Sequence, residues 1–100
     1  MPLRSITRPT SGRWRDGDLL LMDLGAEYGY YTSDITRTIP VNGRFSKEQR
    51  DIYEIVLRAQ KAAIEEMIPG SSMTAAHARA TGVIMDGLRD LGLVTDPECV

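Results

Sequence analysis

Two aspartates, Asp23 and Asp34, are the residues of this sequence whose type and spacing best suit chemistry. Asp23 ends the apolar run 19–22, and Asp34 follows eleven residues later, beyond a Gly- and Tyr-rich connection. Directly opposite residues of an antiparallel hairpin project from one face, about 5 Å apart. Like charges placed opposite or one step diagonally repel unless a shared proton or a metal ion neutralises them. Carboxylates suit hard cations such as Mn²⁺ or Mg²⁺, and Thr36 and Thr38 could support them from the same face.

The same spacing also has a plain structural interpretation, in which Asp23 terminates a strand and Asp34 is solvated. Other candidates for chemistry are weaker. His77, the only histidine, falls on a predicted helix beside an alanine stripe, where a surface or packing role is ordinary. Cys99 has no basic neighbour that would favour the reactive thiolate. From the residues alone, both interpretations of the aspartate pair stay open.

Two predicted strands must position the aspartates. The turn at 16–18 leads into the apolar run 19–22, whose continuous hydrophobicity is typical of a strand covered on both faces. Residues 30–41 are rich in Tyr, Thr, Ile and Val and predict a second strand. Gly25 and Gly29 between the two runs allow a hairpin connection.

Two helices are predicted after the strands. Ser46 and Gln49 form a plausible capping box for the first helix, which Pro69-Gly70 ends. Its expected core stripe is Ile52, Ile55, Val56, Ala59 and Ala63.

The second helix is expected to begin at a cap on Ser72 or Thr74 and to stop near Gly92. Its expected stripe is Ala76, Ala80, Val83, Ile84, Gly87, Leu88 and Leu91. The order strand, strand, helix, helix predicts an α+β fold, a β-hairpin followed by two helices.

Composition sets the remaining limits. With 100 residues, 42% of them hydrophobic and 26% charged, the chain is suited to one small globular domain. A formal net charge of -2 argues against nucleic-acid binding. No apolar run approaches the roughly 18 residues of a membrane span. A single cysteine excludes an internal disulfide framework and favours a reducing compartment.

The first 15 residues contain four arginines and no acid, and we expect them to form a basic, flexible leader. Pro2, Pro9 and Gly12 would break an amphipathic targeting helix. The expected location is therefore cytoplasmic, with the mitochondrion as the alternative that the Arg-rich leader suggests.

The motifs MDLG at 22–25, SDITRT at 33–38 and PVNGRFS at 40–46 carry a family resemblance. Together with the step from Asp23 to Asp34, they resemble the pita-bread metallopeptidases, most closely aminopeptidase P (Xaa-Pro aminopeptidase), with Xaa-Pro dipeptidase a near second. The resemblance runs from about Asp16 to Leu93 and favours the metal interpretation of the aspartate pair.

The resemblance implies a site with two Mn²⁺ ions and five protein ligands, at which a metal-held water attacks an Xaa-Pro bond. Asp23 matches the aspartate that chelates one metal, and Asp34 matches the aspartate that bridges both. The remaining histidine and two glutamates belong to the later half of such a domain, and only seven residues follow Leu93. His77 does not match the ligand histidine.

Residues 16–100 are therefore expected to be the N-terminal half of a catalytic domain, a fragment or truncated form that binds metal weakly or not at all and is inactive alone. No catalytic residue is assigned within it, and its substrate-binding residues stay unknown. The complete enzyme would act on proline-containing peptides, without nucleic acid or membrane partners. The alternative is a non-catalytic protein- or peptide-binding scaffold of the same fold, which could self-associate through its exposed sheet edge.

Overall fold

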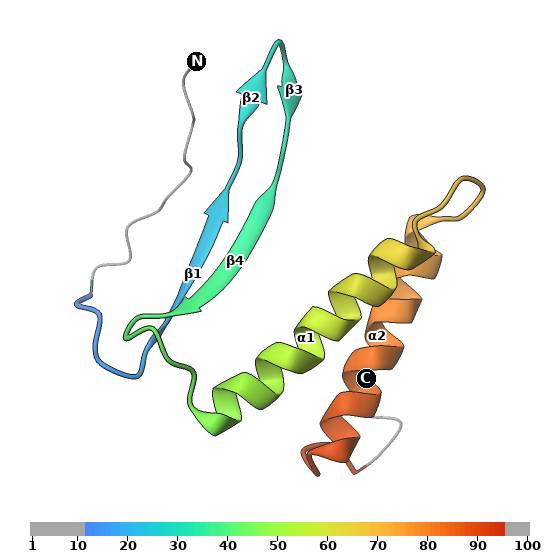
Figure 1. Ribbon diagram of the computed structural model, residues 1–100. Coiled ribbons are helices and arrows are strands. Elements are labelled where there is room, and N and C mark those ends of the chain that lie inside the picture. Colours follow the sequence, from blue (N-terminus) through green and yellow to red (C-terminus); the bar gives the residue numbers. More distant parts are fainter. Residues whose placement is uncertain (1–11, 96–100) are drawn as a thin grey trace. The chain divides into compact units, whose positions relative to one another are not determined.

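The computed structural model describes residues 12–95, so most of the predicted leader and Cys99 lie outside the described residues. The described chain forms two compact units that divide after Ser46. The first unit contains the strands and the second the helices (Figure 1). The elements in order are β1 (Leu19–Leu24), β2 (Glu27–Tyr28), β3 (Tyr31–Thr32), β4 (Ile35–Pro40), α1 (Lys47–Glu66) and α2 (Met73–Asp90). The predicted α+β order, β structure followed by two helices, is confirmed.

The first unit is a long antiparallel ribbon in which β1 pairs with β4 and β2 pairs with β3. Leu24 faces Ile35 and Glu27 faces Thr32, with two residues between these pairs on each arm, so both pairs of strands have the same register. The ribbon in Figure 1 therefore continues from β1 into β2 and from β3 into β4. The sequence predicts two strands at this point, and the structure divides each of them at residues 25–26 and 33–34.

A two-residue turn closes the ribbon between the paired Tyr28 and Tyr31. Gly29 and Tyr30 both have positive φ, 56° and 68°, as a type I′ hairpin turn requires. That turn has the twist that matches the flanking strands, which explains why the chain reverses here. Tyr30 is the only non-glycine residue with positive φ in the described chain, and its side chain is 95% exposed.

The open end of the ribbon is held by the turn predicted at residues 16–18. The Arg15 amide donates to Asp18 Oδ2 at 2.9 Å, and the Val41 amide donates to the Asp18 carbonyl at 3.0 Å. Asn42 Nδ2 donates to Asp16 Oδ1 at 2.9 Å, which joins the two ends of the hairpin. The turn residues thus fix where β1 and β4 enter their common register.

The two faces of the ribbon differ in character, because alternate residues of a strand project to opposite sides. One face, here called the aspartate face, carries Leu19, Leu21 and Asp23 of β1 with Thr36, Thr38 and Pro40 of β4. The opposite face carries Leu20, Met22 and Leu24 with Ile35, Arg37 and Ile39.

Neither face is fully covered by residues 12–95. Leu21 on the aspartate face is 64% exposed, and Leu24 on the opposite face is 43% exposed. The expectation that the run 19–22 is a strand covered on both faces is therefore wrong for the described chain. Covering both faces of a strand needs a packed layer on each side of the sheet.

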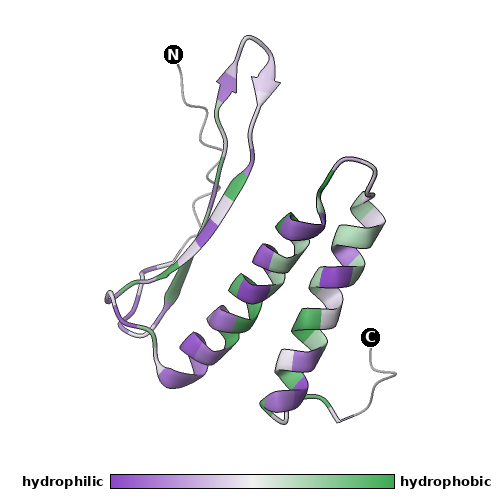
Figure 2. Cartoon of the chain, turned by 45° about the vertical axis from the view of Figure 1, so that its right-hand side comes forward, coloured by the Kyte–Doolittle hydropathy of each residue, from purple (hydrophilic) through white to green (hydrophobic). Residues whose placement is uncertain are grey.

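The second unit is an antiparallel pair of helices joined by a short loop (Figure 1). The described apolar residues that are buried are Ile55 and Ala59 on α1 and Ala76 on α2, and Gly87 of α2 is buried with them. All four belong to the predicted stripes. Figure 2 shows the hydrophobic segments of α1 on its side toward α2. Three other predicted core positions, Ile52, Val56 and Leu91, are exposed.

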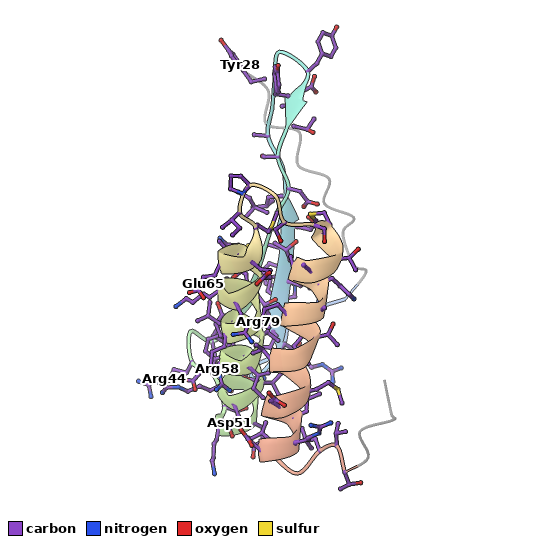
Figure 3. All side chains as sticks on the ribbon, turned by 90° about the vertical axis from the view of Figure 1, so that its right-hand side faces the viewer. Tyr28, Arg44, Asp51, Arg58, Glu65 and Arg79 are labelled. Carbon is purple, nitrogen blue, oxygen red and sulfur yellow. The ribbon has the colours of Figure 1, made fainter. Side chains whose placement is uncertain are left out.

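Charged side chains occupy the outer surfaces of both helices. Figure 3 labels Arg58 and Glu65 on α1 and Arg79 on α2, all of which are exposed. Within residues 12–95, neither helix is long and apolar enough to cross a membrane.

The helix ends follow the predicted signals. The loop after α1 contains a turn in which the Ser71 amide donates to the Ile68 carbonyl at 3.0 Å, with Gly70 at φ 90°. Of the two predicted caps for α2, Ser72 is the one used, since its side chain accepts from the Ala75 amide at 3.1 Å.

Gly92 ends α2 as predicted. It has φ 73°, and its amide donates to the Arg89 carbonyl at 2.9 Å. The Leu93 amide donates to the Leu88 carbonyl at 3.0 Å, which completes a Schellman motif.

Candidate metal-ligand site

Asp23 is held near the end of β1, directly opposite Thr36 of β4. Hydrogen-bonded pairs alternate along an antiparallel ladder, and Asp18–Val41 is one of them. Asp23–Thr36 therefore falls at a non-hydrogen-bonded pair, where opposing side chains come closest. Consistent with this, Thr36 Oγ1 donates to Asp23 Oδ1 at 3.4 Å, which is long for a hydroxyl–carboxylate bond.

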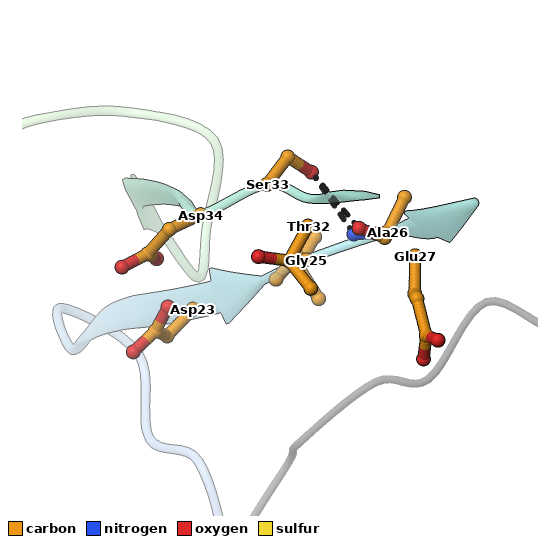
Figure 4. Close-up of a pocket in the computed structure, with 8 residues that line it drawn as sticks. Asp23, Gly25, Ala26, Glu27, Thr32, Ser33 and Asp34 are labelled. Carbon is orange, nitrogen blue, oxygen red and sulfur yellow. Dashed lines mark hydrogen bonds between the residues drawn. The ribbon is translucent and has the colours of Figure 1, made fainter. Parts of the chain in front are cut away.

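Asp34 immediately precedes β4 and lies two residues before Thr36. By strand alternation it is on the aspartate face, as the diagonal neighbour of Asp23. Figure 4 shows both carboxylates extending to the same side of the ribbon. The sequence predicts an opposite or a diagonal arrangement of the pair, and the structure has the diagonal one.

The two aspartates border an open depression of about 520 Å³ in the ribbon (Figure 4). The depression is lined by Asp23, Leu24, Gly25, Ala26, Glu27, Thr32, Ser33 and Asp34. Within residues 12–95, no Lys or Arg forms an ion pair with Asp23 or Asp34; the ion pairs of this part of the chain join Arg50 to Glu54 and Arg89 to Asp86. Two carboxylates thus share one side of the ribbon, and no Lys or Arg among the described residues neutralises them.

The described residues supply only part of a metal site. Residues 12–95 contain no cluster of three or more His, Cys, Asp or Glu side chains that could hold a metal ion. Glu27 lines the depression, but Figure 4 shows its carboxylate turned away from the aspartates. His77 lies exposed on α2. Thr36 contacts Asp23 as predicted, whereas Thr38 lies opposite Leu21, farther from the pair.

Two residues that the sequence analysis did not assign to the site shape it, Ser33 and Gly25. The Ala26 amide donates to Ser33 Oγ at 3.0 Å, and the Ser33 amide donates to the Ala26 carbonyl at 2.9 Å. The Ser33 carbonyl lies so close to Gly25 that a Cβ at that position would overlap it. The only sequence signal for this arrangement was the place of the two residues inside the motifs MDLG and SDITRT, next to the aspartates.

Comparison with known proteins identifies the family. The model of metallopeptidase family M24 matches residues 4–95. The chain belongs to this family. The matched range begins before Asp16, where the motif resemblance starts, and ends two residues after Leu93.

Individual relatives agree with this assignment. The Xaa-Pro aminopeptidase of Haemophilus influenzae is 53% identical over 79 residues, which are 79% of this chain and 18% of that protein. The Xaa-Pro aminopeptidase of Escherichia coli is 44% identical over 80 residues, 80% of this chain and 18% of that protein. The chain therefore spans less than a fifth of the length of these M24 relatives.

The fold matches solved structures of the same family. The Pseudomonas aeruginosa aminopeptidase PepP superposes with a TM-score of 0.79 at 51% identity, covering 82% of this chain and 19% of that structure. A zinc-substituted Escherichia coli aminopeptidase P in complex with product gives 0.77 at 43% identity, with the same coverage of both chains. The predicted fold, part of the aminopeptidase P pita-bread fold, is confirmed. The M24 match and the zinc-substituted structure also show that the family is metal-dependent.

Proposed function

We propose that Asp23 and Asp34 are two of the metal ligands of an Xaa-Pro aminopeptidase site, and that this chain carries part of that site without hydrolysing peptides by itself. The observation that carries the proposal is the diagonal placement of the two carboxylates on one face. They share a depression, and no Lys or Arg of the described chain pairs with them. A bound cation would remove the repulsion between them.

Solved variants of the Escherichia coli aminopeptidase P support this assignment. Two of them have alanine in place of aspartates that are eleven positions apart, the separation of Asp23 and Asp34. Both are 41% identical to this chain, whereas variants at a glutamate or a histidine are 43% identical. The lower identity is what the loss of an aspartate shared with this chain would produce.

The donor chemistry fits a hard divalent cation, and we propose Mn²⁺. Carboxylate oxygens are the ligands that such cations prefer. When bound, the metal would supply an acidified water and polarise the substrate carbonyl. The part of this chain is to hold two carboxylates on one face of the ribbon, with the Thr36 hydroxyl donating to one oxygen of Asp23. Two protein ligands leave most of the coordination to water, so we expect weak binding in this chain alone.

We propose that the substrates of the complete enzyme are peptides with proline in second position. The supporting observations are the Xaa-Pro aminopeptidase relatives and an Escherichia coli aminopeptidase P structure that contains substrate. The described residues include no complete ligand set, so hydrolysis requires the part of the domain that the relatives have and residues 12–95 do not.

The first test maps Mn²⁺ on the 100-residue chain through its paramagnetic broadening of backbone amide resonances. We expect local broadening at residues 23–25 and 33–36, and a loss of at least about tenfold in affinity for Asp34→Asn. The matched control is Asp90→Asn, which removes an exposed carboxylate from α2. Equal broadening in wild type and Asp34→Asn, or no local broadening in wild type, would contradict the metal assignment.

The second test concerns activity. The chain with Mn²⁺ should release no N-terminal residue from an Xaa-Pro peptide. The chain joined to the following part of the Haemophilus influenzae Xaa-Pro aminopeptidase should release it, and the joined protein with Asp23→Asn should not. Hydrolysis by the 100-residue chain alone would overturn the proposal.

The alternative function is a non-catalytic scaffold, and the exposure of Leu21 and Leu24 on opposite faces of the ribbon is the observation that favours it. A scaffold has no need of a cation at the aspartate face. Calorimetry with Mn²⁺ separates the two functions, since equal and negligible heats for wild type and Asp34→Asn support the scaffold.

A further inference from the structure

The ribbon departs from a regular ladder at one pair of residues, Ala26 and Ser33. In a hydrogen-bonded antiparallel pair, each residue donates its amide to the carbonyl of the other. Half of this pattern is present, because the Ser33 amide donates to the Ala26 carbonyl at 2.9 Å. The other half is replaced, because the Ala26 amide donates to the Ser33 hydroxyl oxygen at 3.0 Å (Figure 4). The side chain of Ser33 thus takes the place of its own carbonyl.

Gly25 provides the space into which the displaced carbonyl turns. The Ser33 carbonyl oxygen lies too close to the place where a Cβ of residue 25 would be, so any other residue would push it away. A peptide unit is planar, and turning the Ser33 carbonyl therefore also turns the amide of Asp34, the next residue. The orientation of the Asp34 backbone, and with it the direction of the carboxylate, depends on this exchange of acceptors.

We propose that Ser33 and Gly25 are positioning residues that aim Asp34 at the cation held by Asp23. The inference rests on the proposed metal-ligand function of the two aspartates. The hydroxyl of Ser33 satisfies the Ala26 amide, and Gly25 makes room for the turned carbonyl. Neither residue is assigned as a metal ligand. Without the hydroxyl, the Ala26 amide regains the Ser33 carbonyl as its acceptor, and the ladder straightens through Asp34.

The test is the same Mn²⁺ titration by amide broadening, applied to three substitutions in the 100-residue chain. Ser33→Ala should weaken Mn²⁺ binding by about tenfold or more, as changes behind a metal ligand commonly do. Ser33→Thr keeps the hydroxyl and should restore binding to within about twofold of wild type. The control, Ser71→Ala, removes a serine hydroxyl from the exposed loop between the helices and should leave binding unchanged.

Gly25→Ala is an independent test, because its Cβ displaces the Ser33 carbonyl while the Ser33 hydroxyl remains. It should weaken Mn²⁺ binding as much as Ser33→Ala does. A readout without metal accompanies both substitutions: the amide resonance of Ala26 should move in Ser33→Ala and stay in place in Ser33→Thr.

Asp34→Asn separates the failure of this inference from the failure of the proposed function. If Asp34→Asn weakens binding while Ser33→Ala and Gly25→Ala bind Mn²⁺ as wild type does, the positioning role is overturned and the ligand role stands. If Ser33→Thr binds as weakly as Ser33→Ala, the hydroxyl is not the reason, and the inference is also overturned. If Asp34→Asn binds like wild type, the ligand role itself fails.

Discussion

Thr36 lies directly opposite Asp23 in the ribbon, and its hydroxyl donates to Asp23 Oδ1 at 3.4 Å. The contact joins the two long strands at the end nearest the depression. It occupies one carboxylate oxygen and limits the rotation of the side chain. At this length the bond is weak, so its contribution is to orientation more than to stability.

Thr36→Val should therefore weaken Mn²⁺ binding while leaving the fold intact. Valine keeps the shape and the β propensity of threonine but removes the hydroxyl. We expect a loss of about tenfold in affinity, at the low end for residues that support a metal ligand. The measurement is the Mn²⁺ titration, and Thr38→Val, on the same face but opposite Leu21, is the control. Equal losses in the two variants would count against a specific role of Thr36.

Gly87→Ala should destabilise the helix pair although alanine favours helices. A Cβ at Gly87 would lie 2.7 Å from both Cγ1 and Cγ2 of Ile55, which is 3% exposed. We expect a loss of about 1–3 kcal/mol in the free energy of unfolding, typical of overpacking. Urea unfolding followed by far-ultraviolet circular dichroism measures it.

Gly82→Ala is the matched control for Gly87→Ala. Gly82 lies in the same helix and is exposed, and a Cβ added to it would meet no atom within 4 Å apart from the adjacent helix backbone. The substitution should raise the free energy of unfolding by about 0.5–1 kcal/mol through helix propensity alone. We expect Gly87→Ala to lower the free energy of unfolding and Gly82→Ala to raise it. An increase in both variants would mean that the helices separate easily at Ile55.

Ser72→Ala should lower stability by about 1 kcal/mol, because the Ala75 amide loses its acceptor at the start of α2. Ser72→Asp should retain the cap and the stability. Ser71→Ala, one residue earlier, changes a serine that does not cap the helix and should have an effect below about 0.5 kcal/mol. Thermal unfolding of the three variants checks this, and a larger effect at Ser71 would contradict the assignment of the cap.

Tyr30→Asn should stabilise the ribbon by about 0.5–1 kcal/mol, because asparagine tolerates the left-handed conformation that tyrosine adopts at a cost. The exposed Tyr30 side chain gives up little packing in return. Hydrogen exchange of the Tyr28 and Tyr31 amides reports the local gain. Tyr31→Asn, at a position without positive φ, should bring no such protection.

Local signals in the amino-acid sequence were sufficient to predict the order of strand and helix regions and the family motifs. They also singled out the two aspartates that the structure places on one face of the ribbon. Ser72 and Gly92 mark helix ends through their own backbone and side-chain chemistry, and periodicity identified Ile55, Ala59 and Ala76 as core positions. Strand alternation also limited the two aspartates to an opposite or a diagonal arrangement.

Only the structure shows which of these two arrangements occurs. The reason lies in the pairing of residues that are far apart in the sequence. The register places Thr36, and not Asp34, opposite Asp23. The exchange of acceptors at Ser33 depends on a carbonyl that passes over Gly25, a contact between the two arms of the ribbon. The exposure of the β1 leucines also could not be predicted from the sequence. A run of apolar residues indicates that a strand can be buried, but it does not show whether the described chain contains a layer that covers the strand.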